Sequence, residues 1–257
     1  MARWVGRGPL LLVSSCVLLF AALAAVVCIR HGAPLSGDQA AHSWALGHEP
    51  PIVVALARGI TDTGTGVWPY LFAVAAGAIA GRTTRERLRA VAAAFPGHGQ
   101  LVRTGLMELF ARARPARTDW AAHASGFAFP SGHSTTSALV AGLLCWAATR
   151  RAGPALARTA CALAVYWAAA VGLTRVYLGV HWASDVAGGW LFGAGWLGLC
   201  LCAVARWLPG EFSGRTATPT QRTERMARAT HGAGTAPETM EDHEPQDPGR
   251  RGRSRPA

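Results

Sequence analysis

Apolar segments alternate with short polar or arginine-rich stretches along residues 1–208. The first segment can cross a hydrocarbon core of roughly 30 Å as an α-helix rising about 1.5 Å per residue. A cleaved signal peptide is the alternative for this segment, although its apolar run continues well past Cys16. The pattern predicts an all-α fold, a six-transmembrane-helix bundle forming one domain. The segments are Pro9–Ile29, Val67–Ala80, Leu88–Phe110, Ser134–Ala148, Ala155–Leu173 and Val186–Leu208.

Three regions are less regular than the rest. Pro96 interrupts Leu88–Phe110, which is therefore either a kinked helix shielded by its neighbours or a segment lying partly outside the membrane. His31–Gly66 is predicted to be a polar loop, with a short apolar piece, Ile52–Ala57, along the membrane interface. Residues 209–257 are rich in Arg, Thr, Pro, Gly and Glu, and we expect a disordered cytoplasmic tail there.

Composition supports a membrane protein. The chain has 257 residues, of which 51% are hydrophobic and only 15% charged, which is too apolar for an ordinary soluble domain of this size. All 25 basic residues are arginine, and the ten tryptophans lie mostly in or beside apolar segments. Nucleic acid is therefore not an expected partner. The six cysteines lie inside apolar segments without CxxC spacing, so we predict neither disulfide nor metal roles for them.

The arginines predict how the chain crosses the membrane. Most of them cluster at the ends of apolar segments that should face the cytoplasm. We therefore expect a multi-pass protein of the cell membrane with both termini inside. One cluster, Arg112, Arg114 and Arg117, falls on the opposite side, together with Ser131, His133, Arg175 and His181. Arginine on that side indicates a catalytic or anion-binding duty, so we predict an active site on the extracytoplasmic side.

Pro130-Ser131-Gly132-His133 stands where a loop turns into an apolar helix. Ser131 is a natural helix cap, and Gly132 lets the backbone approach a ligand closely. Free amides and the dipole at a helix N-terminus form an anion site, beside which His133 would stand. Taken alone, the string is equally compatible with a plain helix cap and an incidental histidine.

A second string, Thr174 to Asp185, changes that balance. His181 and Asp185 are four residues apart, so on a helix they would share a face, and the carboxylate could hold one ring nitrogen protonated while the other attacks. Arg175 offers a planar guanidinium suited to phosphate oxygens at the end of an apolar segment. A lone His/Asp pair is more often structural, but its occurrence with Arg175 and the first string on one membrane face predicts a phosphoryl-transfer site.

These strings resemble the type 2 phosphatidic acid phosphatase superfamily, the integral-membrane lipid phosphatases related to vanadium haloperoxidases. The family pattern has three blocks: Lys-x6-Arg-Pro, Pro-Ser-Gly-His and Ser-Arg-x5-His-x3-Asp. Pro130–His133 matches the second block in full, and Arg175, His181 and Asp185 match the third, with Thr174 in place of serine. The specific resemblance covers about residues 106–190.

By this resemblance, His181 is the nucleophile that forms a phosphohistidine, Asp185 orients it, and His133 protonates the leaving oxygen. The phosphate-binding residues implied are Arg114, Ser131, Gly132 and Arg175. The resemblance implies no metal and no other cofactor. The expected activity is hydrolysis of a lipid phosphate or polyprenyl diphosphate, with the substrate and membrane lipids as the partners.

The first block departs from the family pattern. Arg114-Pro115 fits, but the position of the family's lysine is Met107. Arg103, one helical turn earlier, or the nearby Arg112 are possible substitutes; Arg103 could instead merely mark a membrane edge. Losing one charged phosphate contact would cost about 2–4 kcal/mol in the transition state. Two alternatives therefore stay open: a phosphotransferase acting on a lipid or sugar acceptor, and a catalytically degenerate lipid-phosphate binding protein.

Overall fold

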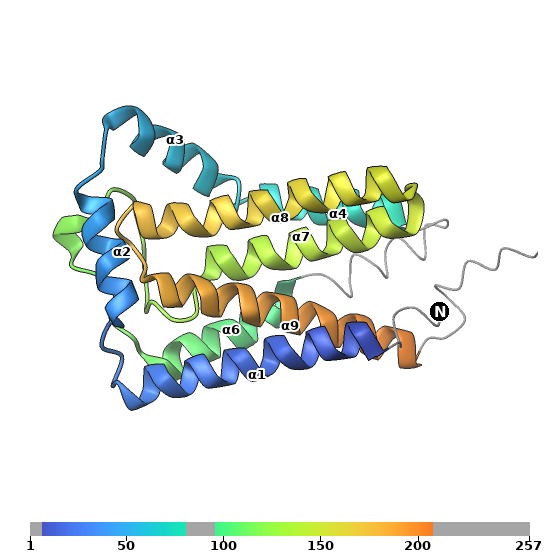
Figure 1. The fold of residues 1–257 in the computed structure, drawn as a ribbon, viewed down its shortest axis with the longest axis horizontal. Coiled ribbons are helices and arrows are strands. Elements are labelled where there is room, and N and C mark those ends of the chain that lie inside the picture. The colour runs from blue at the N-terminus through green and yellow to red at the C-terminus, as the bar shows by residue number, and fades with distance from the viewer. Residues whose placement is uncertain (1–6, 81–95, 208–257) are drawn as a thin grey trace, which may run out of the picture. The chain divides into compact units, whose positions relative to one another are not determined.

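The computed structural model describes residues 7–80 and 96–207, and the regular structure in these two ranges is entirely helical (Figure 1). A single 3-10 turn, Arg117–Asp119, accompanies the α-helices. The α-helices are α1 (Arg7–Ile29), α2 (Ser36–Leu46), α3 (Pro51–Asp62), α4 (Trp68–Ala80), α6 (Pro96–Phe110), α7 (Gly132–Arg151), α8 (Pro154–Tyr177) and α9 (Ala183–Trp207).

Helix α7 lies at the centre of the bundle, where it contacts α4, α6, α8 and α9, while α1 packs on the outside of α9. In Figure 1 the long helices run alongside one another, and α2 lies across one end of them, where it contacts α8 and α9. The start of α7, the end of α8 and the start of α9 all lie at this end. The topology therefore brings the two motif strings together.

Within residues 7–80 and 96–207, three helical stretches are long and apolar enough to cross a membrane: Leu10–Ile29, Pro154–Tyr177 and Ala183–Ala203. Helix α4 is apolar but shorter. Helix α7 has 20 residues, but Ser134, Thr135 and Ser137 lower its hydropathy; they are buried against other helices rather than exposed to lipid. The prediction of an all-helical membrane protein is confirmed, whereas six spans remain a prediction.

The predicted loop His31–Gly66 is wrong, because this stretch forms α2 and α3. Pro51 occupies the first turn of α3, where its fixed φ is compatible with a helix and no intrahelical donor is lost. Asp38 lies in the first turn of α2, and its carboxylate accepts the Leu35 amide at 3.0 Å. In the third predicted segment, residues 88–95 lie outside the described ranges, and the remaining residues form α6. The predicted tail, 209–257, is also outside them.

Glycines on α9 allow α7 and the chain before it to come close. A Cβ atom on Gly188 would lie 2.4 Å from the Phe129 ring, and one on Gly189 would lie 2.6 Å from the Ser131 carbonyl oxygen. At Gly193 the nearest atom would be a carbonyl oxygen of α7 at 2.7 Å. Small residues at such spacing permit backbone contact between membrane helices. This crossing sets the distance between the first motif string and Asp185.

Candidate active site

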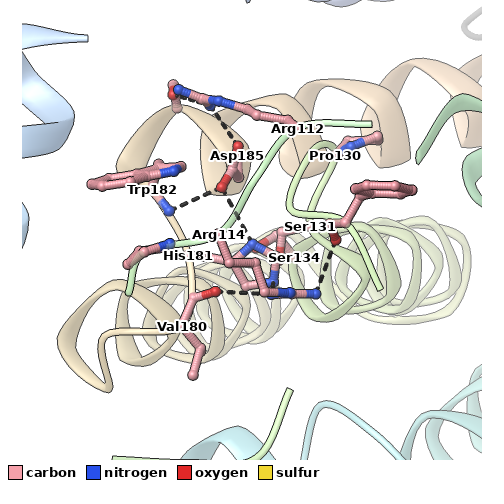
Figure 2. Close-up of polar contacts among 12 residues, drawn as sticks. Arg112, Arg114, Pro130, Ser131, Ser134, Val180, His181, Trp182 and Asp185 are labelled. Atoms are coloured by element: carbon pink, nitrogen blue, oxygen red, sulfur yellow. Dashed lines mark hydrogen bonds and ion pairs between the residues drawn. The ribbon is translucent and has the colours of Figure 1, made fainter. Parts of the chain in front are cut away.

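The candidate active site lies where three segments meet: the loop after α6, the start of α7 and the connection between α8 and α9 (Figure 2). They contribute Arg114, Ser131 and His181 respectively. Each was predicted from the sequence, and the fold brings all three to one end of the bundle.

His181 is 2% exposed and lies in the loop between α8 and α9. The expectation that His181 and Asp185 share a helix is wrong, because α9 begins at Ala183. The loop turns at Gly179, whose φ is +70° and where a Cβ atom would lie 2.1 Å from the Asp119 carbonyl oxygen. A residue with a side chain could not occupy this position without moving the backbone.

The two ring nitrogens of His181 have different partners. Nε2 lies 2.8 Å from Arg114 Nη1, and since arginine can only donate, Nε2 is the acceptor. The neutral ring therefore carries its proton on Nδ1. This nitrogen lies 3.4 Å from Asp185 Oδ2, an ion-pair distance at which no hydrogen bond is formed. The arrangement leaves the lone pair of Nε2 directed at the arginine side of the site.

The surroundings of His181 favour its neutral form. Burial, followed by the positive charges of Arg114 and Arg175, holds its pKa well below the ordinary value. A neutral imidazole is the form that can act as a nucleophile.

Asp185 is held by a buried ionic network (Figure 2). Its Oδ1 accepts from Arg112 Nη1 at 2.5 Å, and its Oδ2 accepts the Trp182 amide at 2.9 Å. Arg112 Nη2 also donates to Asp38 Oδ2 at 2.8 Å. Ser184 completes the network, donating from its hydroxyl and its amide to the two Asp38 oxygens at 2.6 and 2.7 Å.

Arg112 has all five N–H groups engaged. Besides Asp185, Asp38 and the Ser184 hydroxyl, it donates to the carbonyl oxygens of Gly32 and Ala33. The side chain is fully buried. Of the two arginines considered as substitutes for the missing lysine, Arg112 therefore has no donor left for a phosphate group. Its contacts are those of a residue that positions Asp185.

Sequence reasoning missed Asp38 and Ser184. Asp38 lies 74 residues from Arg112 in the chain and stood within a stretch predicted to be a loop. The only signal in the sequence was that Asp38 is acidic and could stand in the first turn of a helix. Such a residue predicts a favourable helix N-terminus but no contact with a distant arginine. The link to Asp185 depends on how α2 docks across α8 and α9.

Arg114 is fixed by backbone oxygens. It donates to the carbonyls of Gly126, Ser125 and Phe127 at 2.9, 2.8 and 3.0 Å, and to that of Val180 at 2.8 Å. These contacts tie the loop after α6 to the loop that carries His181. The guanidinium is thus preorganised beside Nε2, where the charge of a transferring phosphoryl group would develop.

Ser131 directly precedes α7 and is fully buried. Its amide donates to the Asp185 backbone carbonyl at 3.0 Å. The sequence predicted that the Ser131 hydroxyl caps the helix, and this prediction is wrong. The hydroxyl instead accepts a hydrogen bond from the Ser134 hydroxyl at 3.2 Å. The first amides of α7 have no intrahelical partners, and with the helix dipole they form a ready site for an anion.

Arg175 lies in the last turn of α8 and is 3% exposed. Nη1 donates to the Thr61 hydroxyl at 3.3 Å, and Nη2 lies 3.5 Å from the His123 carbonyl oxygen. Its Nε is buried and has no hydrogen-bond partner in the described part of the chain. A buried unsatisfied donor is costly and points to a ligand on this side.

His133 lies between two cavities. One, of about 300 Å³, is lined by Arg103, Gly132 and His133, among others. The other, of about 610 Å³, is lined by His133 and Arg175, among others. His133 thus links the α6 side of the site to the α3 and α8 side. A phosphate at this position would be surrounded by the arginine donors, and its negative charge would favour protonation of the histidine.

Arg103 extends along α6 toward the start of α7. Nη1 lies 3.5 Å from both Met107 Sδ and the Pro130 carbonyl oxygen, and a Cβ atom on Gly132 would lie 3.2 Å from it. Gln100 fixes the guanidinium by accepting from Nε at 2.7 Å. Arg103 therefore presents a cation beside the side chain at the position of the family's lysine.

Comparison with known proteins places this chain in a class of membrane lipid phosphatases. The model of the PAP2 superfamily matches residues 90–209. Phosphatidylglycerophosphatase B of Bacillus subtilis is 33% identical over 186 residues, which cover 70% of this chain and 88% of that protein. The chain belongs to the PAP2 superfamily, as the sequence motifs indicated.

Two further comparisons agree. Decaprenylphosphoryl-5-phosphoribose phosphatase of Mycobacterium tuberculosis is 35% identical over 148 residues, covering 56% of this chain and 76% of that protein. The crystal structure of a transmembrane PAP2 type phosphatidylglycerolphosphate phosphatase from Bacillus subtilis superposes with a TM-score of 0.64 at 28% identity, covering 76% of this chain and 96% of that one. The predicted enzyme class is confirmed at the level of the family.

Proposed function

We propose that this protein hydrolyses a lipid phosphate at the extracytoplasmic membrane surface through a phosphohistidine on His181. The observation that carries the proposal is the orientation of the His181 ring: Nε2 accepts from Arg114 at 2.8 Å, and Nδ1 faces Asp185 at 3.4 Å. A nucleophile needs an unprotonated nitrogen, and a group that stabilises the positive ring formed on attack.

In the first step, Nε2 of His181 forms a bond to phosphorus as the bond to the lipid oxygen breaks. Arg114 moves its hydrogen bond from Nε2 to a phosphate oxygen, and Arg175 and the first amides of α7 bind the others. His133 gives a proton to the leaving oxygen, so that a lipid alcohol departs.

In the second step, His133 accepts a proton from water, and the water oxygen attacks phosphorus. The bond to Nε2 breaks, inorganic phosphate leaves and both histidines regain their starting states. Among the described residues, no cluster of three or more His, Cys, Asp or Glu side chains could hold a metal ion. In this proposal the arginines supply the positive charge that meets the phosphoryl group.

Arg103 takes the place of the family's lysine in the proposal. Its guanidinium lies beside Met107, Pro130 and Gly132, so it can reach the same anion. An arginine there binds two phosphate oxygens at once, whereas a lysine acts as a point charge. This supports an active enzyme over a degenerate binding protein.

Phosphate release from phosphatidate, phosphatidylglycerophosphate and a polyprenyl diphosphate, in detergent with EDTA, tests the function. We expect release from at least one lipid, and a loss of roughly 1,000-fold or more in His181→Ala. Thr118→Ala, an exposed change at the same end of the molecule, is the control. No His181-dependent release from any lipid contradicts the proposal. A new phosphate ester formed with an added alcohol, in place of free phosphate, supports the phosphotransferase instead.

A further inference from the structure

Gln100, Arg103 and Met107 follow one side of α6 at the site end of the bundle. Their spacing of i, i+3 and i+7 places side chains on the same side of a helix. Gln100 and Arg103 both line the cavity of about 300 Å³ beside His133. The cation proposed to replace the family's lysine therefore shares a wall of this cavity with a neutral amide.

Hydrogen bonds connect Gln100 to its neighbours in a fixed direction. Since arginine can only donate, Arg103 Nε donates to Gln100 Oε1 at 2.7 Å, which sets the end of the amide that faces the arginine. The other end, Nε2, donates to the Thr136 hydroxyl oxygen at 2.5 Å. That hydroxyl in turn donates to the Gly132 carbonyl oxygen at 2.9 Å. A directed chain of three hydrogen bonds therefore runs from the arginine on α6 to the first turn of α7.

The chain of hydrogen bonds holds the arginine at Nε and leaves donors at the terminal nitrogens. Arg103 Nη1 lies 3.5 Å from both Met107 Sδ and the Pro130 carbonyl oxygen, a distance at which a hydrogen bond is weak. Nη2 donates to the Thr104 hydroxyl at 3.2 Å and carries a second N–H group. Arg112, by contrast, has all five N–H groups engaged. The guanidinium of Arg103 is thus oriented and can still donate to a phosphate group.

An arginine at position 103 depends on such support more than a lysine at position 107 would. Arg103 stands one helical turn before Met107, so its long side chain must be fixed toward the start of α7, and fixing it costs rotamer entropy. A hydrogen bond at Nε restricts the rotamers before the anion arrives. A lysine at position 107 would carry its charge on a terminal ammonium, and Gln100 is two helical turns away from that position.

We infer that Gln100 and Thr136 are positioning residues that make Arg103 the phosphate-binding cation of this chain. The inference rests on the proposed function and adds two residues that lie in none of the three motif blocks. They hold the guanidinium beside Pro130 and Gly132, where the first amides of α7 would bind the same anion. A unit of three side chains thus takes the place of one lysine.

The test compares variants on whichever of the three lipids named above is hydrolysed fastest. Gln100→Met keeps the length and the helix preference of the side chain and removes both of its hydrogen bonds. We expect it to lower kcat/KM by about tenfold and to weaken competitive inhibition by inorganic phosphate by a similar factor, because the cation is no longer held in one orientation. In the Arg103→Met background, with or without Met107→Lys, the same change should cost less than about twofold.

Thr136→Val tests the second link of the hydrogen-bond chain. It keeps the shape of the side chain and removes the acceptor of the Gln100 amide, so we expect a loss of about threefold that again requires Arg103. Thr149→Val is the matched control, because the Thr149 hydroxyl donates to the carbonyl oxygen four residues earlier, at 3.0 Å, at the other end of α7. Gln39→Met changes an exposed glutamine on α2. Both controls should leave kcat/KM unchanged.

Wild-type activity in Gln100→Met would overturn the inference. Equal losses from Gln100→Met in the presence and absence of Arg103 would also overturn it, because a residue that only docks α6 on α7 would lower activity in both backgrounds. Neither result affects the role proposed for His181. Absence of His181-dependent release from every lipid is the separate failure, in which the proposed function is rejected and this inference with it.

Discussion

At the scale of single residues, the exchange of a lysine for Met107 is the main departure from the family pattern, and Arg103 is the residue placed to compensate for it. Both side chains lie on α6, four residues apart, with Arg103 Nη1 at 3.5 Å from Met107 Sδ. We expect Arg103→Met to lower kcat/KM by about 30- to 1,000-fold, since one charged contact to the phosphate is lost.

Met107→Lys provides the matched rescue. In the Arg103→Met background it should restore much of the lost activity, because the cation returns from the family's own position. In the wild-type background it should give no gain, since two cations would then compete for one anion. Full activity in Arg103→Met, or no rescue in a double variant that folds normally, would show that Arg103 does not contact the phosphate.

A second prediction at this scale concerns His181 and pH. Its folded-state pKa is lowered, mainly by burial, so at acidic pH the unfolded chain binds a proton that the folded chain does not. The free energy of unfolding should therefore fall as the pH drops below about 6.5, by at most about 1.4 kcal/mol per pH unit, and be unaffected above it. His181→Asn should make this slope shallower. Thermal unfolding of both proteins between pH 5 and 8 measures it, and parallel curves contradict it.

At the scale of elements, the long apolar segments were predictable because membrane helices carry a strong compositional signal. The structure places α1, α8 and α9 within a few residues of the predicted segments. Helices α2 and α3 were missed because they are short and mixed in polarity. Their stability comes from docking at the site end, through contacts such as Asp38 with Arg112, which no local pattern encodes.

The candidate site, too, was predictable where a local sequence pattern encodes it and not where it depends on the tertiary fold. The motif residues His133, His181, Asp185 and Arg175 could be found from their spacing, since the chemistry fixes their types. The prediction that His181 and Asp185 share a helix failed, because the loop that turns at Gly179 runs past His181 and α9 begins only at Ala183. The supporting carboxylate on α2 depends on the tertiary fold, and so does the cavity next to α3.

Helix α2 should act on catalysis through Asp185. Asp38 balances the charge of Arg112, so that Asp185 remains able to stabilise a positive His181 ring. We expect Asp38→Asn to lower kcat by about tenfold or more with little change in KM. In an Asp185→Asn background the same change should add little, because the effect passes through the missing carboxylate.

The control on the same helix is His42→Gln, which alters the contact with Asp119 Oδ2 at 3.0 Å and leaves the Arg112 network in place. If α2 matters only for docking, His42→Gln and Asp38→Asn should lower kcat alike, and the losses from Asp38→Asn and Asp185→Asn should multiply. Kinetics of the four single and double variants distinguish the two cases.

At the scale of the whole molecule, the two ends of the bundle carry their charges differently. At the site end, Arg112 is neutralised by Asp38 and Asp185, and Arg114 is held by backbone oxygens. In the proposed function these arginines serve the site, so their presence does not oppose an extracytoplasmic position. At the other end, the turn between α7 and α8 is flanked by Arg150, Arg151 and Arg158. Such charge is typical of the cytoplasmic side.

Cysteine labelling tests this orientation, starting from an active variant without the six native cysteines. Ala116→Cys places an exposed thiol at the site end, and Gly153→Cys places one in the turn between α7 and α8, where a Cβ atom meets nothing within 4 Å. In right-side-out vesicles, a membrane-impermeant maleimide should label Ala116→Cys at once and Gly153→Cys only after permeabilisation. The reverse order would place the active site on the cytoplasmic side. In that case the arginines at the site end would also mark the cytoplasmic side. Phosphatase activity on lipid added from outside should follow the same order, because a substrate confined to one leaflet reaches the histidines only from the face on which they open.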